Sequence, residues 1–249
     1  MKLKVEKSEN YEWAIIIDET DLRRLEETIK LSLDSQNNEI IYIKYKVKCS
    51  DGSNIETNDI NEVINEENSK ERSIKNIKII AGNQNFSKNV DISLGDSGFI
   101  KSNTVSYSIT GDTRDWVYLS ASKIDERLKT LKQWYSIFQK INLYLIIFIF
   151  GAICYSYILS ISTKEPSAIT FLEYLKGFSI IILIIIIVYL IYKIIGFCYN
   201  YLFPLTVFRI SAGIKRHDAI IDLRSKIFWG IFVALIVSII SGLLFYTII

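Results

Sequence analysis

The strongest hydrophobic pattern in the chain is an apolar stretch over residues 178–203. Ile180 to Ile187 is an unbroken run of Ile and Leu, and Lys193 is the only charged residue in the stretch. A hydrocarbon core about 30 Å thick is crossed by about 20 apolar helical residues. A helix of a soluble core would carry a polar face, and this stretch has none. The pattern therefore predicts a membrane-spanning helix.

Two further apolar stretches predict spans at 141–161 and 227–249. Their flanks differ in charge: residues 123–140 and 204–226 each contain five Lys or Arg, whereas residues 162–177 contain two Lys and two Glu. Basic flanks stay on the cytoplasmic side of a membrane, and the N-terminus lacks the apolar run of a secretory signal. The sequence thus predicts a multi-pass cell-membrane protein with a cytoplasmic N-terminus and an extracellular C-terminus.

Before the spans, the pattern is that of a small soluble domain. The apolar run Trp13–Ile17 predicts a buried strand, and residues 18–33 place Leu and Ile at helical spacing behind acidic residues. Residues 41–49 alternate with a period of two, and Asp51-Gly52 is a hairpin signal. This strand carries three lysines on one face, which indicate a solvated or edge strand or, alternatively, a site for an anionic ligand: Lys44, Lys46 and Lys48.

Residues 54–71 are polar and acidic, and they permit either a short helix or a loop. Three more strands are predicted, at 73–81, 90–94 and 104–110. The fold class is therefore an α+β N-terminal domain over residues 1–121, followed by an α-helical transmembrane domain of three spans over residues 141–249.

A linking helix is expected between the two, over residues 122–140. Ser122 to Asp125 resembles a capping box, and no Pro or Gly interrupts the chain between Ser122 and Gly151. The helix is expected to continue into the first span. It would be either a rod that carries movement into the bilayer or a simple tether.

Charge divides the chain into an acidic and a basic half. Residues 1–122 contain 16 Lys and Arg against 21 Asp and Glu, and residues 123–249 contain 13 against 6. The acidic half argues against direct nucleic-acid binding through phosphates, whereas the basic half is suited to anionic lipid headgroups. Five residues before the last span are candidates for lipid binding, or they only set the topology: Arg209, Lys215, Arg216, Arg224 and Lys226.

Lys193 lies inside the second predicted span, where a charge is costly. It either extends to the cytoplasmic headgroups or lines a pore or subunit contact. Because three spans enclose little space, a pore would require a homo-oligomer.

The sequence contains no motif for catalysis, so the chain is predicted not to be an enzyme. Its three cysteines are widely spaced, which supports neither a disulfide framework nor a metal site. Phosphate-binding and metalloprotease motifs are absent. The single histidine, His217, stands beside Asp218 in the basic segment and is interpreted as an exposed surface residue. No cofactor, metal or catalytic residue is therefore expected.

This plan, with spans at 141–161, 178–203 and 227–249 behind a small cytoplasmic domain, resembles the membrane effectors of prokaryotic antiviral systems. These include the membrane partners of short Argonautes and nucleotide-triggered transmembrane effectors. The resemblance is one of architecture. It implies a protein that is quiet until a cytoplasmic sensor, such as a short Argonaute or a nucleotide-signalling system, engages its N-terminal domain. It would then oligomerise and permeabilise or depolarise the membrane in abortive infection.

Two other functions fit the same sequence. The chain would be a membrane anchor or scaffold that recruits a soluble partner, or a subunit of a larger membrane sensor or transport complex. Membrane depolarisation separates the effector from the scaffold.

Overall fold

The computed structural model describes residues 4–33, 41–85, 87–95, 104–140, 186–187, 189–190, 192–194 and 196–248. The chain divides into two compact units. One contains residues 1–136 together with 204–249, and the other contains residues 137–203. All the contacts described below, unless stated otherwise, lie within the first unit.

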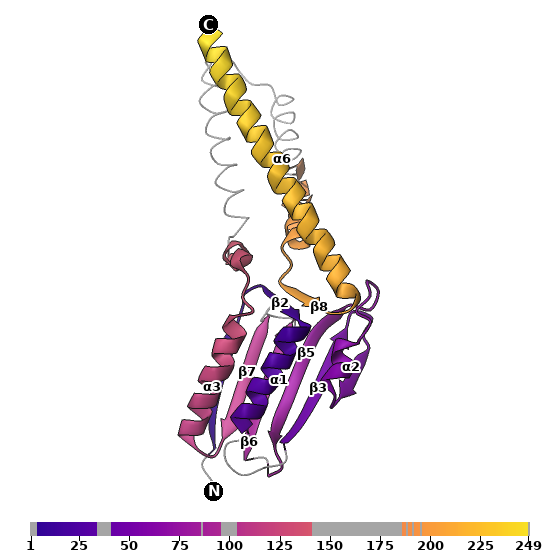
Figure 1. Cartoon of the computed structure of the whole chain (residues 1–249), viewed down its shortest axis with the longest axis vertical. Helices are drawn as coiled ribbons and strands as arrows, with labels where there is room; N and C mark the ends of the chain where they lie inside the picture. The colour runs from indigo at the N-terminus through magenta and orange to yellow at the C-terminus, as the bar shows by residue number, and fades with distance from the viewer. Residues whose placement is uncertain are drawn as a thin grey trace, which may run out of the picture. The chain divides into compact units, whose positions relative to one another are not determined.

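An antiparallel sheet of six strands forms the centre of the first unit (Figure 1). Its strands follow the spatial order β1-β7-β6-β5-β3-β4, so that β1 and β4 are the edges. The core-facing positions of β5, β6 and β7 are Ile, Val, Leu, Ala and Tyr residues, which are buried. The strand bounds, in chain order, are Val5–Tyr11 (β1), Ile41–Cys49 (β3), Asn54–Thr57 (β4), Ile74–Asn83 (β5), Lys88–Gly95 (β6) and Val105–Gly111 (β7).

Three helices cover one face of this sheet: α1 (Glu19–Leu33), α2 (Ile60–Ile64) and α3 (Arg114–Lys129) (Figure 1). The helices α1 and α3 each bury one apolar stripe at spacings of three and four residues, as amphipathic helices do. Trp116 of α3 also donates its indole N–H to the carbonyl oxygen of Ser32 at 2.8 Å. The predicted α+β domain is confirmed in its mixture of helices and sheet, and the acidic segment after residue 53 forms β4 and α2.

A second, two-stranded sheet joins distant parts of the chain. Strand β2 (Ile15–Asp18) pairs in parallel with β8 (Thr206–Arg209), with Ile15 opposite Thr206 and Asp18 opposite Arg209. Ile15, Ile17 and Phe208 belong to the hydrophobic core of the domain. Residues that follow two of the predicted spans therefore complete the N-terminal domain.

The last helix, α6, runs from Ala212 to Ile248. Among the described residues, it is the one helix that is long and apolar enough to cross a membrane, and its large apolar side chains between Ile227 and Ile240 are exposed. It covers the predicted span at 227–249 as far as Ile248, but it begins before Lys215, so part of the basic segment is helical. The predicted span at 141–161 lies outside the described residues. Of the stretch 178–203, the described residues are helical as far as Leu202.

The predicted linking helix is wrong in its bounds. Helix α3 begins at Arg114 and ends at Lys129, and a separate 3-10 helix, η1, covers Trp134–Lys140. Between them, Lys132 bridges to Ile15, and the amide of Gln133 donates to the carbonyl oxygen of Ala14 at 2.9 Å. This extended pairing competes with helical hydrogen bonds and interrupts the helix. A continuous rod from residue 122 to the first predicted span is therefore contradicted.

Candidate functional site

The loop after α2 holds the start of α6 through one buried side chain, Asn68. Asn68 is 1% exposed and has a positive φ of 47°, a conformation that Asn tolerates better than most residues. Its Nδ2 donates to the carbonyl oxygens of Phe208, at 2.8 Å, and Ile210, at 3.1 Å. Both carbonyl groups lie just before α6, so the amide fixes the approach to that helix.

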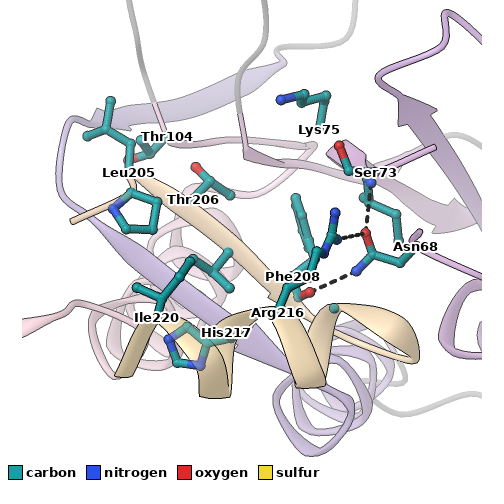
Figure 2. A pocket seen from close by; sticks show the side chains of 14 residues that line it. Asn68, Ser73, Lys75, Thr104, Leu205, Thr206, Phe208, Arg216, His217 and Ile220 are labelled. Atoms are coloured by element: carbon teal, nitrogen blue, oxygen red, sulfur yellow. Dashed lines mark hydrogen bonds between the residues drawn. The ribbon is translucent and has the colours of Figure 1, made fainter. Parts of the chain in front are cut away.

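The side-chain oxygen of Asn68 accepts two further hydrogen bonds. Oδ1 of Asn68 accepts from the Ile74 amide at 3.0 Å and from Nη2 of Arg216 at 2.8 Å (Figure 2). Nη1 of Arg216 donates to the carbonyl oxygen of Ser69 at 2.9 Å. The side-chain amide of Asn68 thus connects β5, β8 and α6. Its N–H groups and its oxygen all take part in hydrogen bonds.

Two backbone carbonyl groups accept further hydrogen bonds in the same contact. The amide of Ala212 donates to the carbonyl oxygen of Glu67 at 3.2 Å, and Oγ of Ser211 donates to that of Ile64 at 3.1 Å. A Cβ atom on Gly213 would lie 2.3 Å from Nδ2 of Asn68, so only glycine fits there. We call this contact between loop 65–73 and residues 208–216 the junction.

A cavity of about 360 Å³ adjoins the junction (Figure 2). Its lining comes from loop 65–73, from β5 and β8, and from the first turns of α6. The residues with polar side chains in the lining are Asn68, Ser73, Lys75, Thr104, Thr206, Arg216 and His217. The cavity wall therefore carries positive charge, and Asp and Glu are absent from the described residues that form it.

His217 is buried in this wall, so the interpretation of it as an exposed residue is wrong. Its side chain is 4% exposed, and both ring nitrogens lack a hydrogen-bond partner among the described residues. Gly213, His217 and Ile220 all line the cavity at helical spacing. That spacing is the signal in the sequence that indicates an inward face of α6, but its packing partner, β8, is not evident locally.

The candidate lipid-binding residues do not form one group. Arg216 belongs to the junction, and Lys215 is exposed. Arg209 pairs with Asp218 at 3.1 Å. Lipid binding by these residues remains a prediction.

The last two candidates of this group are on α6. Lys226 pairs with Asp222 at 2.7 Å, and the guanidinium of Arg224 lies over the ring of Tyr135 at 5.2 Å. In the second unit, the ammonium of Lys193 lies 5.7 Å from the ring centroid of Tyr189. Its role as a pore or subunit contact also remains a prediction.

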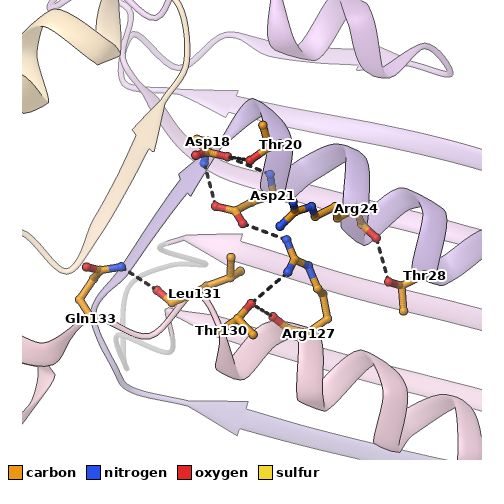
Figure 3. A network of polar contacts seen from close by, with 9 residues as sticks. All are labelled: Asp18, Thr20, Asp21, Arg24, Thr28, Arg127, Thr130, Leu131 and Gln133. Carbon is orange, nitrogen blue, oxygen red and sulfur yellow. Dashed lines mark hydrogen bonds and ion pairs between the residues drawn. The ribbon is translucent and has the colours of Figure 1, made fainter.

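A second polar network connects the N-terminus of α1 with the C-terminus of α3 (Figure 3). Nη2 of Arg127 donates to Asp21 at 2.9 Å, and Asp18 accepts from Thr20 and from the Asp21 amide. Burial raises the pKa of Asp21 despite this ion pair. Burial also opposes ionisation of Asp18, but the hydrogen bonds from Thr20 and Asp21 outweigh it and lower the pKa of Asp18. The network caps α1 and holds the two helices together.

Two of the three lysines of β3 have a partner on the neighbouring strand. Lys44 and Lys46 both pair with Glu56 of β4, the latter at 2.6 Å. These two hydrogen-bonded lysines lower the pKa of Glu56 to about 2. Strand β3 lies between β5 and β4, so it is not an edge strand, and its lysines lie on a solvated face of the sheet.

Among the residues that the structure describes, no group of three His, Cys, Asp or Glu side chains is placed to hold a metal ion. No protein-family model matches the chain, and neither the curated proteins nor the solved structures compared with it gave a match.

Proposed function

We propose that the chain is a membrane effector that is triggered through its N-terminal domain. In this proposal the domain is cytoplasmic and binds a sensor protein or signal. The active form is a homo-oligomer that permeabilises or depolarises the membrane in antiviral defence. The chain crosses the membrane at 141–161, 178–203 and 227–249, and its C-terminus is extracellular.

The observation that carries this proposal is the junction. Asn68 and Arg216 bind the start of α6 to the loop of the folded domain, and the later turns of the same helix expose Ile, Val, Leu and Phe. A change in loop 65–73 would therefore act on α6 without an intervening flexible linker. A simple tether would not need a buried amide with four hydrogen-bond partners.

Lipid contact belongs to the same proposal. Lys215 and Lys226 are exposed on α6 before or at the start of its apolar part, where anionic headgroups would meet them. Arg216 is assigned to the junction instead, because its guanidinium holds Asn68 and Ser69.

The test is the membrane potential of cells that express the full chain with its neighbouring gene products under phage or plasmid challenge. A voltage-sensitive dye should report depolarisation, and Arg216→Gln should reduce it at equal membrane abundance because the junction is weakened. Arg24→Gln is the matched control, since Arg24 is exposed on α1 and carries the same charge. A steady potential with the unaltered chain under each challenge would overturn the effector.

One observation favours the scaffold as the second candidate. The face of the six-stranded sheet opposite the helices carries polar side chains that are exposed or half-buried, among them Ser8, Asn10, Ser93, Ser106, Ser108 and Thr110. A partner could dock there. A scaffold would keep its function when residues 227–249 are replaced by an unrelated span, whereas the effector would lose it.

A further inference from the structure

The cavity beside the junction has the chemistry of a ligand site. Its volume, about 360 Å³, lies within the range of small-molecule sites, about 300–1,000 Å³. Apolar residues form much of its wall, including Ile74, Leu205 and Phe208. Such a cavity encloses the organic part of a small molecule by burying its apolar surface.

The polar part of the wall is suited to an anion. Lys75 and Arg216 bring two positive charges to the cavity, and no acidic residue is among the described residues that line it. Ser73 and Thr206 add hydroxyl groups, whereas the hydroxyl of Thr104 donates to the carbonyl oxygens of Tyr11 and Trp13. Charged N–H donors and hydroxyls around one cavity match a tetrahedral oxyanion, which has several acceptor oxygens.

His217 gives an independent reason to expect a ligand. A buried polar group without a hydrogen bond costs about 1–3 kcal/mol, and most such groups in folded proteins have a partner. The His217 ring is buried in the cavity wall, and both of its nitrogens lack one among the described residues. A bound molecule would supply the missing hydrogen-bond partner.

We propose that this cavity binds a phosphate-bearing small molecule, with Lys75 and Arg216 balancing its charge and His217 donating a hydrogen bond to it. The site contains Arg216, which also holds Asn68. The ligand would therefore stabilise the junction. Its role as a regulator rests on the proposed function, whereas its binding does not.

The test uses the single histidine of the chain. In the full chain labelled with ¹⁵N-histidine and held in phosphatidylcholine nanodiscs, every imidazole signal belongs to His217. Inorganic phosphate, added at constant ionic strength, should shift this signal with saturation. Lys75→Gln should weaken the apparent affinity at least tenfold, because it removes one of the two charges. Lys48→Gln, on the exposed face of β3, should leave the affinity unchanged.

A second arm identifies the source of the phosphate. Nanodiscs that contain phosphatidic acid, without free phosphate, would shift the His217 signal if a lipid headgroup enters the cavity. The site is supported if the His217 signal shifts in either arm and Lys75→Gln weakens that shift. The site is overturned if the signal shifts in neither arm, or if it shifts and Lys75→Gln does not alter the shift. The membrane potential does not enter this measurement, so failure of the site and failure of the proposed function are distinguishable.

Discussion

Replacing Asn68 with alanine should release the start of α6 from the domain. The change removes the hydrogen bonds to Phe208, Ile210, Ile74 and Arg216. It leaves the carbonyl group of Phe208 and the backbone amide of Ile74 in a buried place without this partner, whereas the carbonyl group of Ile210 still accepts from the Gly213 amide at 2.8 Å. Each of these two groups costs about 1–3 kcal/mol, so the expected loss is about 2–6 kcal/mol.

The backbone adds a separate contribution. At a φ of 47°, alanine is strained by about 1–2 kcal/mol relative to an ordinary conformation, whereas glycine is not. Asn68→Gly should therefore be less destabilising than Asn68→Ala by about 1 kcal/mol. Both losses are a large fraction of the 5–15 kcal/mol that stabilises a typical domain.

Hydrogen exchange of the full chain in nanodiscs measures the local loss of stability at the start of α6. A local destabilisation of 3 kcal/mol accelerates exchange about 150-fold, and peptides that cover residues 205–216 should show it. Asn54→Ala is the control, because Asn54 is exposed on β4. If exchange over residues 205–216 changed less than fivefold in Asn68→Ala, the amide would not hold the junction, and the reasoning would be refuted.

Three further changes test separate parts of the structure. Gly213→Ala should cost about 1–3 kcal/mol in unfolding free energy, since its Cβ would lie 2.4 Å from the carbonyl oxygen of Phe208. Lys44→Gln should raise the pKa of Glu56 from about 2 towards 4.5, which carboxyl NMR measures. The stabilisation from this lowered pKa is present above about pH 4.5 and is lost as the pH falls through about 2. Ile92→Ala, at a fully buried position of β6, should cost about 2–5 kcal/mol in denaturant unfolding.

Each of these expectations has a contrasting result. Gly230→Ala is the control for Gly213, because nothing lies within 4 Å of its Cβ position; equal effects would contradict the steric argument. An unchanged pKa in Lys44→Gln would show that Glu56 does not depend on that ion pair. A loss below 1 kcal/mol in Ile92→Ala would mean that the core closes around the missing side chain.

Local patterns predicted most of the domain but missed strands β1 and β8. The strand at 41–49 and the helix after Asp18 carry clear periods, and both are confirmed. Strand β1 was missed because Lys7 and Glu9 occupy its core-facing positions beside Val5 and Tyr11, which weakens the apolar alternation. Strand β8 has only four residues, and its partner lies near the other end of the sequence.

The candidate site was harder to predict because it depends on that missed pairing. Asn68 stands in a polar, acidic segment, where nothing local distinguishes it from its neighbours. His217 looks exposed in a basic run, but it is buried on α6, which packs against β8. Charge patterns indicate how a segment meets solvent, whereas burial follows from contacts between distant segments.

The pairing of β2 with β8 sets an order of events during synthesis. The ribosome makes residues 137–203 before it makes Thr206, so the first unit cannot close until that whole segment has been synthesised. A chain that stops before Pro204 lacks β8, which leaves β2 and the amide of Asn68 without their native partners. Such a product exposes the surfaces that chaperones and proteases select. The junction thus forms only in chains that extend at least to Arg216.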